Sequence, residues 1–174
     1  MVSKVKRCDK KRGVILIEVV IAMAIMVVVG GIVTIMTFSN NKILSKVDMK
    51  SELQLEGQLI QIQLNSVAFG SNGAKEVVFK ENTNEIESLI LYDESYDYQF
   101  AVKGNTVIYR KIQGEKVLIE KELSSKVSKI VVVPEGENLL RSNYMEFNIT
   151  LEMKRGGQVV DYQIDNYIVF RNFR

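Results

Sequence analysis

The chain has 174 residues, of which 47% are hydrophobic and 25% are charged, and its formal net charge is +2. This length allows one ordinary domain plus one additional element. The near-neutral charge, with no run of Lys and Arg interleaved with aromatic residues, gives no sign of nucleic-acid binding. There is no His, which excludes His general bases, His-ligated zinc and the Ser-His-Asp and Cys-His catalytic arrangements. The single cysteine, Cys8, leaves the remainder without a disulfide or a thiolate metal site, so we expect no cofactor and no metal.

Residues 1–13 are basic and precede a long apolar run. They carry one acid, Asp9, against six cationic side chains, which are Lys4, Lys6, Arg7, Lys10, Lys11 and Arg12. The run from Val14 to Phe38 contains one ionisable residue, Glu18. As a helix of about 25 residues it would be roughly 37 Å long, enough to cross a hydrocarbon core of roughly 30 Å. The excess of positive charge before it predicts a single-pass segment over 14–39 with a cytoplasmic N-terminus and an external C-terminal part.

Two other kinds of signal fit this segment poorly. A cleavable secretory signal has an apolar core of about 7–15 residues that ends at an A-x-A-like site. The residues at the end of this run, Met36-Thr37-Phe38-Ser39, do not match such a site. Cys8 precedes the apolar run, which excludes a lipoprotein signal.

Glu18 is unusual because a carboxylate in lipid costs several kcal/mol unless it is paired or neutralised. One interpretation is that Glu18, one turn from the membrane surface, reaches back to the interface and has no further role. A second interpretation is favoured by the surrounding residues, which are Lys10-Lys11-Arg12-Gly13-Val14-Ile15-Leu16-Ile17-Glu18. A basic leader, a Gly, four apolar residues and a Glu resemble the class III signal of type IV prepilins.

The resemblance implies that a membrane prepilin peptidase cuts after Gly13 and methylates the new amine of Val14. Glu18 would then be the fifth residue of the mature chain and would pair with the amine of a neighbouring subunit in an extracellular filament. The family's usual first residue is Phe and its second is often Thr, so Val14 and Ile15 depart from the pattern. Two opposite charges in an apolar medium cost far less together than apart, which gives the spacing a physical reason. If Gly13 is instead a capping or hinge glycine at the membrane edge, no cleavage follows.

Gly30 and Gly31 interrupt the apolar run, and each costs roughly 1 kcal/mol relative to Ala inside a helix. We expect local softening of the helix here, as filament pilins often show on assembly. Small residues that allow close helix packing in lipid are the alternative interpretation.

Residues 40–70 contain no Pro and are predicted to continue the helix as an amphipathic stalk. Apolar residues fall on two opposite sides of this helix at 100° per residue. The first side contains Leu44, Val47, Leu55, Leu59 and Ile62, and the second contains Met49, Leu53, Ile60, Leu64 and Val67. A helix that lies on a sheet needs one apolar side, so the other would meet neighbouring stalks. The alternative is a helix buried on both sides within its own domain.

Residues 71–174 read as a β-rich extracellular head. Eight strands are predicted, over 76–80, 86–92, 98–103, 106–113, 116–121, 129–133, 144–154 and 158–171. Turn sequences join several of them, which are Gly104-Asn105, Gln113-Gly114-Glu115 and Arg155-Gly156-Gly157. The fold class is therefore α+β, with a long N-terminal helix packed on a mainly antiparallel sheet.

The head also resembles particular members of the prepilin-like family. The stretch from Tyr98 to Arg110 is similar to the hairpin of PilW-like minor pilins and of J-type pseudopilins of type II secretion. Residues 168–172 are similar to the final strand of the same proteins. The resemblance implies a structural subunit of a type IV pilus, a DNA-uptake pseudopilus or a secretion pseudopilus, and not an enzyme. The alternative is an uncleaved, signal-anchored extracellular binding or sensory domain.

The acids Asp93, Glu94 and Asp97 could be read as a calcium loop, because hard cations need several close oxygens. They lack the Asp-x-Asp-x-Asp-Gly spacing, so a solvated turn between strands is the preferred interpretation. No pair of acids elsewhere has a spacing that marks catalytic carboxylates.

Overall fold

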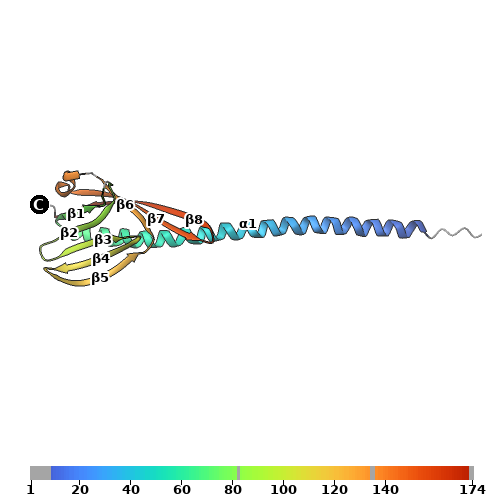
Figure 1. The fold of residues 1–174 in the computed structure, drawn as a ribbon, viewed down its shortest axis with the longest axis horizontal. Helices are drawn as coiled ribbons and strands as arrows, with labels where there is room; N and C mark the ends of the chain where they lie inside the picture. Colours follow the sequence, from blue (N-terminus) through green and yellow to red (C-terminus); the bar gives the residue numbers. More distant parts are fainter. Residues whose placement is uncertain (1–8, 82, 134–135, 173–174) are drawn as a thin grey trace, which may run out of the picture. The chain divides into compact units, whose positions relative to one another are not determined.

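A computed structural model describes residues 9–81, 83–133 and 136–172. The chain divides into two units, residues 1–45 and 46–174. Helix α1, Asp9–Gly70, contributes its first part to one unit and its last turns to the other. An α+β fold, with one long N-terminal helix and mainly antiparallel sheets, is therefore confirmed (Figure 1).

Eight strands follow the helix, and all eight predicted strands are confirmed, with ends that differ by a few residues. They are β1 Gly73–Phe79, β2 Ile86–Tyr92, β3 Asp97–Lys103, β4 Thr106–Gln113, β5 Lys116–Ser124, β6 Val127–Val133, β7 Tyr144–Arg155 and β8 Gln158–Val169, with the 3-10 helix η1 Gly136–Arg141 between β6 and β7. Glycines with φ near +60°, at positions 104, 114 and 156, occupy the predicted hairpin turns, where a residue without Cβ adopts this conformation at least cost.

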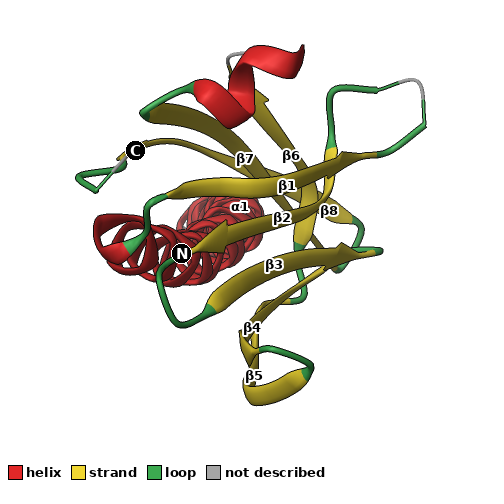
Figure 2. Cartoon of the chain, turned by 90° about the vertical axis from the view of Figure 1, so that its left-hand side faces the viewer, coloured by secondary structure: helices red, strands yellow, loops and turns green. Residues whose placement is uncertain are grey.

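The strands form two separate antiparallel meanders and not one sheet. The first has the order β1-β2-β3-β4-β5 and the second the order β6-β7-β8. An isolated bridge between Glu85 and Val131 joins the two. Figure 2 shows the two sheets around the C-terminal part of α1. Each sheet therefore turns one face toward the same helix.

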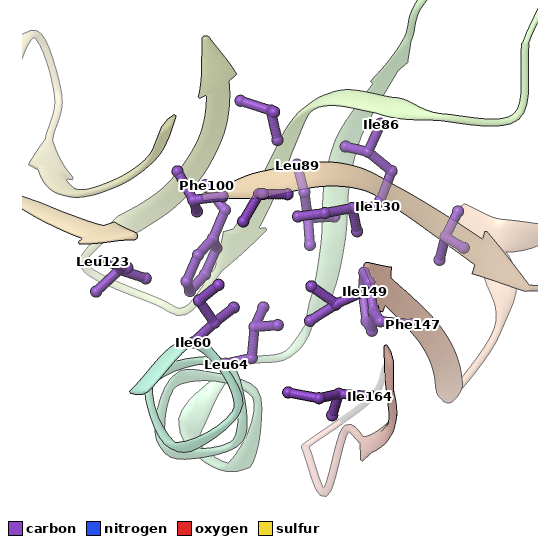
Figure 3. Packing of buried hydrophobic residues seen from close by; sticks show 14 of the residues in the cluster. Ile60, Leu64, Ile86, Leu89, Phe100, Leu123, Ile130, Phe147, Ile149 and Ile164 are labelled. Atoms are coloured by element: carbon purple, nitrogen blue, oxygen red, sulfur yellow. The ribbon is translucent and has the colours of Figure 1, made fainter. Parts of the chain in front are cut away.

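The core lies between that helix and the two sheets. Met49, Leu53 and Ile60 of α1 are fully buried, and Leu64 and Val67 are nearly so. Ile60 and Leu64 point toward Phe100 of the first sheet and Ile149 of the second (Figure 3). The opposite side of the helix, with Val47, Leu55, Leu59 and Ile62, is 51–65% exposed. The prediction of two apolar sides is confirmed, and the alternative of burial on both sides within the domain is wrong because the sheets cover one side.

Gly57 lies where the helix passes close to Leu151 and Ile164 of the second sheet. A Cβ at this position would lie 2.0 Å from Cδ1 of Ile164 and 3.3 Å from Cδ1 of Leu151. A larger residue would therefore require the end of the Ile164 side chain to move. Glycine fits here, although it lowers the stability of the helix by itself.

The same substitution should have a large effect on stability on the buried side of the helix and a small effect on the exposed side. Leu53→Ala should destabilise the head by about 2–5 kcal/mol, because it removes a fully buried side chain and leaves a cavity. Leu55→Ala removes a side chain that is 61% exposed and should change the free energy of unfolding by less than about 0.5 kcal/mol. Urea unfolding of a fragment of residues 40–174 measures both. Equal losses for the two variants would contradict the assignment of the buried side.

Candidate functional site

The first part of α1 is apolar and is not covered by protein. It contains the one helix segment, within the described ranges, that is long and apolar enough to cross a membrane, with a mean hydropathy of 2.8 over 18 residues. Large side chains from Ile15 to Phe38 are 47–75% exposed. This agrees with a single-pass, membrane-anchored chain by length and composition.

The predicted cleavage and assembly residues fall at the start of this helix. The backbone of Gly13 and Val14 belongs to α1, and Glu18, one turn further on, is exposed. The first eight residues of the basic leader lie outside the described residues. Gly30 and Gly31 are helical, an added Cβ at either would meet nothing within 4 Å, and Thr34 Oγ1 donates a hydrogen bond of 2.8 Å to the Gly30 carbonyl oxygen. Cleavage, the Glu18 ion pair and softening at the two glycines stay predictions.

The exposed apolar residues Val47, Leu55, Leu59 and Ile62 form what we call the outer stalk face. They recur along four turns of α1, and each is more than half exposed. Contiguous exposed apolar surface on a soluble domain marks an interaction surface more often than scattered apolar residues do. The helix that anchors the head thus also presents an unpartnered apolar side.

A group of charged residues, which we call the stalk clamp, ties the helix to the strands. Lys126 Nζ, in the β5–β6 connection, donates hydrogen bonds to Glu52 and, at 2.6 Å, to Oε1 of Glu56. Ser124 Oγ donates to Oε2 of Glu56 at 2.5 Å, and Arg155 Nη2 at the end of β7 donates to Oε2 of Glu52 at 2.9 Å. Both sheets are thereby bonded to two successive turns of one helix, on the side next to the buried apolar residues.

The clamp shifts the pKa values of Glu52 and Lys126. The hydrogen bond from Lys126 is the main cause that lowers the pKa of Glu52, with a further contribution from Arg155, while partial burial opposes it. Burial disfavours the charged form of Lys126, but hydrogen bonds from its ammonium to Glu52 and Glu56 outweigh this and raise its pKa above the ordinary value. The charged forms of these groups are therefore the ones that stabilise the fold.

The acidic turn between β2 and β3 is a hydrogen-bonded turn. Asp93 Oδ1 accepts bonds of 2.7 Å from the backbone N–H groups of Ser95 and Tyr96, and its Oδ2 accepts one of 2.7 Å from the Tyr98 hydroxyl. Burial raises the pKa of Asp93, but these bonds outweigh it and leave the pKa below the ordinary value. Asp97 pairs with Lys75 Nζ at 2.7 Å. The carboxylates of Asp93 and Asp97 thus have protein partners, and the described residues contain no group of three His, Cys, Asp or Glu side chains placed to hold a metal.

The sequence predicted the two apolar sides of the helix but missed the stalk clamp and the close approach at Gly57. Lys126 and Glu52 are 74 positions apart in the chain, and Arg155 and Glu52 are 103 apart. No local spacing signals such pairs, although the isolated Gly57 inside a helical pattern was a usable sign of close packing.

Comparisons with family models, with curated proteins and with solved structures return no match for this chain.

The stalk clamp predicts a loss of stability in acid. Because the pKa of Glu52 is lower in the folded state than its ordinary value of 4.5, its contribution is complete above that value and is lost as the pH falls through the folded pKa. Urea unfolding of residues 40–174 at about pH 7 and about pH 3 should show a smaller free energy of unfolding at the lower pH. Lys126→Met, which removes the main cause of the shift, should reduce this difference. An identical pH dependence in both proteins would contradict the role given to the clamp.

Proposed function

We propose that the chain is a type IV prepilin-like subunit, of the minor pilin or pseudopilin kind, that is anchored in the membrane and then built into an extracellular filament. The observation that carries the proposal is the position of Glu18. It is the one ionisable residue between Val14 and Phe38, and it follows Gly13 by five positions behind a basic leader.

Cleavage after Gly13 would expose the amine of Val14 at the end of an apolar helix. A free cation there would be as costly as the free carboxylate of Glu18. Pairing the two between adjacent subunits removes both costs and sets the axial offset of one subunit from the next. This arrangement gives the carboxylate a function that an uncleaved anchor does not.

The outer stalk face supports assembly for a separate reason. An anchored monomer gains nothing from four exposed apolar residues beyond the membrane segment, since the head does not cover them. Packing of neighbouring stalks would bury them and would continue the apolar contacts of residues 14–38. An uncleaved binding or sensory domain stays the competing function, and the mature N-terminus distinguishes the two.

Processing tests the proposal directly. In cells with an active prepilin peptidase, the membrane fraction should contain a chain that begins at Val14 and carries a methylated amine, as measured by mass spectrometry. Gly13→Val should block cutting, because a β-branched side chain does not fit a subsite that accepts glycine, and the precursor should accumulate.

The matched control is Gly30→Val, the same change within the same helix at a position where an added Cβ meets nothing within 4 Å. It should be cut at the wild-type level. A wild-type chain that keeps an intact Met1 in such cells would refute the prepilin function and favour the uncleaved anchor.

A further inference from the structure

Within the described residues the head has four edge strands, β1 and β5 in the first sheet and β6 and β8 in the second, and each has one neighbour in its sheet. β5 ends the first sheet and β8 ends the second, while the bridge between Glu85 and Val131 joins the two sheets near β6. A strand at a sheet edge presents unpaired backbone N–H and C=O groups that can accept another strand. β5 and β8 both belong to the compact unit 46–174.

β5 has the features of an edge strand that binds another protein surface. Its first seven residues are exposed on both faces of the sheet, and they include three consecutive large apolar residues. Val117 is 46% exposed, Leu118 41% and Ile119 50%. β8 also presents exposed apolar residues on its outer side, with Val159 at 57% and Val169 at 59%.

On one face of each edge strand the charges have the same spacing and opposite sign, whereas Glu120 and Glu122 of β5 lie on the other face, where Glu120 pairs with Arg110. On β5, Lys116 lies opposite Gln113 of β4 and Lys121 lies opposite Tyr109. The two lysines are therefore four ladder positions apart, although they are five positions apart in the sequence. The difference arises because Leu118 is an extra residue, a β-bulge between the partners of Lys111 and Ile112. On β8, Asp161 and Asp165 are also four positions apart, opposite Glu152 and Asn148 of β7.

These two lysines and two aspartates are exposed, and none of them is in an ion pair within the part of the chain that the structure describes. Each pair also lies on one face of its strand, because residues an even number of ladder positions apart share a face. When β5 and β8 lie side by side, each of the two lysines can therefore lie opposite one of the two aspartates.

We propose that the β5 edge of one copy of this chain pairs with the β8 edge of a second copy. Lys116 and Lys121 then meet Asp161 and Asp165, and Ile119 lies opposite Gln163 at the midpoint for either strand direction. The contact uses two different surfaces of the same chain, so it is heterologous and continues from copy to copy. It goes beyond the proposed function, since it concerns the head and requires no cleavage at Gly13.

Pairing of β5 with β5 of a second copy is a poorer solution. Ile119 is the midpoint of the face that carries both lysines. If two copies of β5 pair in antiparallel orientation about a two-fold axis at Ile119, Lys116 of each copy lies opposite Lys121 of the other. Like charges directly opposite are destabilising in a sheet. The β5–β8 pair replaces both repulsions with attractions.

Cysteine cross-linking of the full chain in membranes tests the contact. Directly opposite residues in an antiparallel pair have Cα atoms about 4.5–5.5 Å apart, which is within the range of a disulfide. With Cys8→Ser as background, a chain carrying both Ile119→Cys and Gln163→Cys should form a ladder of dimers, trimers and larger species on mild oxidation. Two co-expressed chains with one cysteine each should stop at dimers, which is the signature of a heterologous contact.

Charge reversal supplies the specificity control. Lys116→Asp with Lys121→Asp should reduce the cross-linked fraction by about tenfold or more, because like charges then face each other. Adding Asp161→Lys and Asp165→Lys should restore it. Lys129→Asp with Arg141→Asp changes the net charge equally on other exposed elements and should leave the ladder unchanged.

Three results would overturn the inference: no ladder, a ladder that survives the first reversal, or equal dimer formation by Ile119→Cys alone, which would indicate a β5–β5 contact. The mature N-terminus of the same samples is read separately. A chain that begins at Val14 without a ladder refutes only the edge contact, whereas a ladder on chains with an intact Met1 refutes only the prepilin function.

Discussion

The burial of one side of α1 is the contact on which the head depends. Neither sheet is closed, and the two are joined by one isolated bridge, so each would expose an apolar face without a third layer. Met49, Leu53 and Ile60 provide that layer for both sheets at once. If these turns of the helix moved away from the sheets, the core would therefore be exposed to water.

Apolar contact is non-directional and does not by itself fix how far along the helix the strands sit. The stalk clamp and Gly57 supply this position. Lys126 and Arg155 can reach their carboxylates only where Glu52 and Glu56 pass, and Ile164 fits against the helix only where there is no Cβ. The orientation of the buried side in turn determines which residues remain on the outer stalk face.

Much of the fold could be predicted because its signals are local. The strand alternation, the glycines of the hairpin turns and the two apolar sides of the helix are all set by residues within a few positions of one another. The division into two sheets could not be predicted, since alternation does not tell which strands pair. The bulge at Leu118 and the stalk clamp were missed for the same reason, because each depends on a partner distant in sequence.

Some features of the candidate site could likewise be predicted from the sequence, and others required the structure. The spacing from Gly13 to Glu18 and the length of the apolar run are readable from sequence, and they carry the proposed function. That the outer stalk face is bare required the structure, because either side of the helix could have been the buried one. The match between Lys116, Lys121 and the two aspartates of β8 also required it, since in sequence the lysines are five residues apart.

The central claim is that Glu18 acts in assembly by neutralising the amine of a neighbouring subunit, and its removal tests this most directly. Glu18→Ala should be cut normally, because Gly13 and the leader are unchanged, but its incorporation into filaments should fall more than about tenfold. Loss of one partner of a buried ion pair costs about 3–5 kcal/mol. Glu18→Gln keeps the shape and some hydrogen bonding and should lie between the two. The measurement is immunoblotting of sheared filaments beside whole-cell processing, with filament number counted in the same preparation. Normal cleavage together with wild-type incorporation and filament number for Glu18→Ala would contradict the pairing role and leave Glu18 as a carboxylate that reaches the membrane surface.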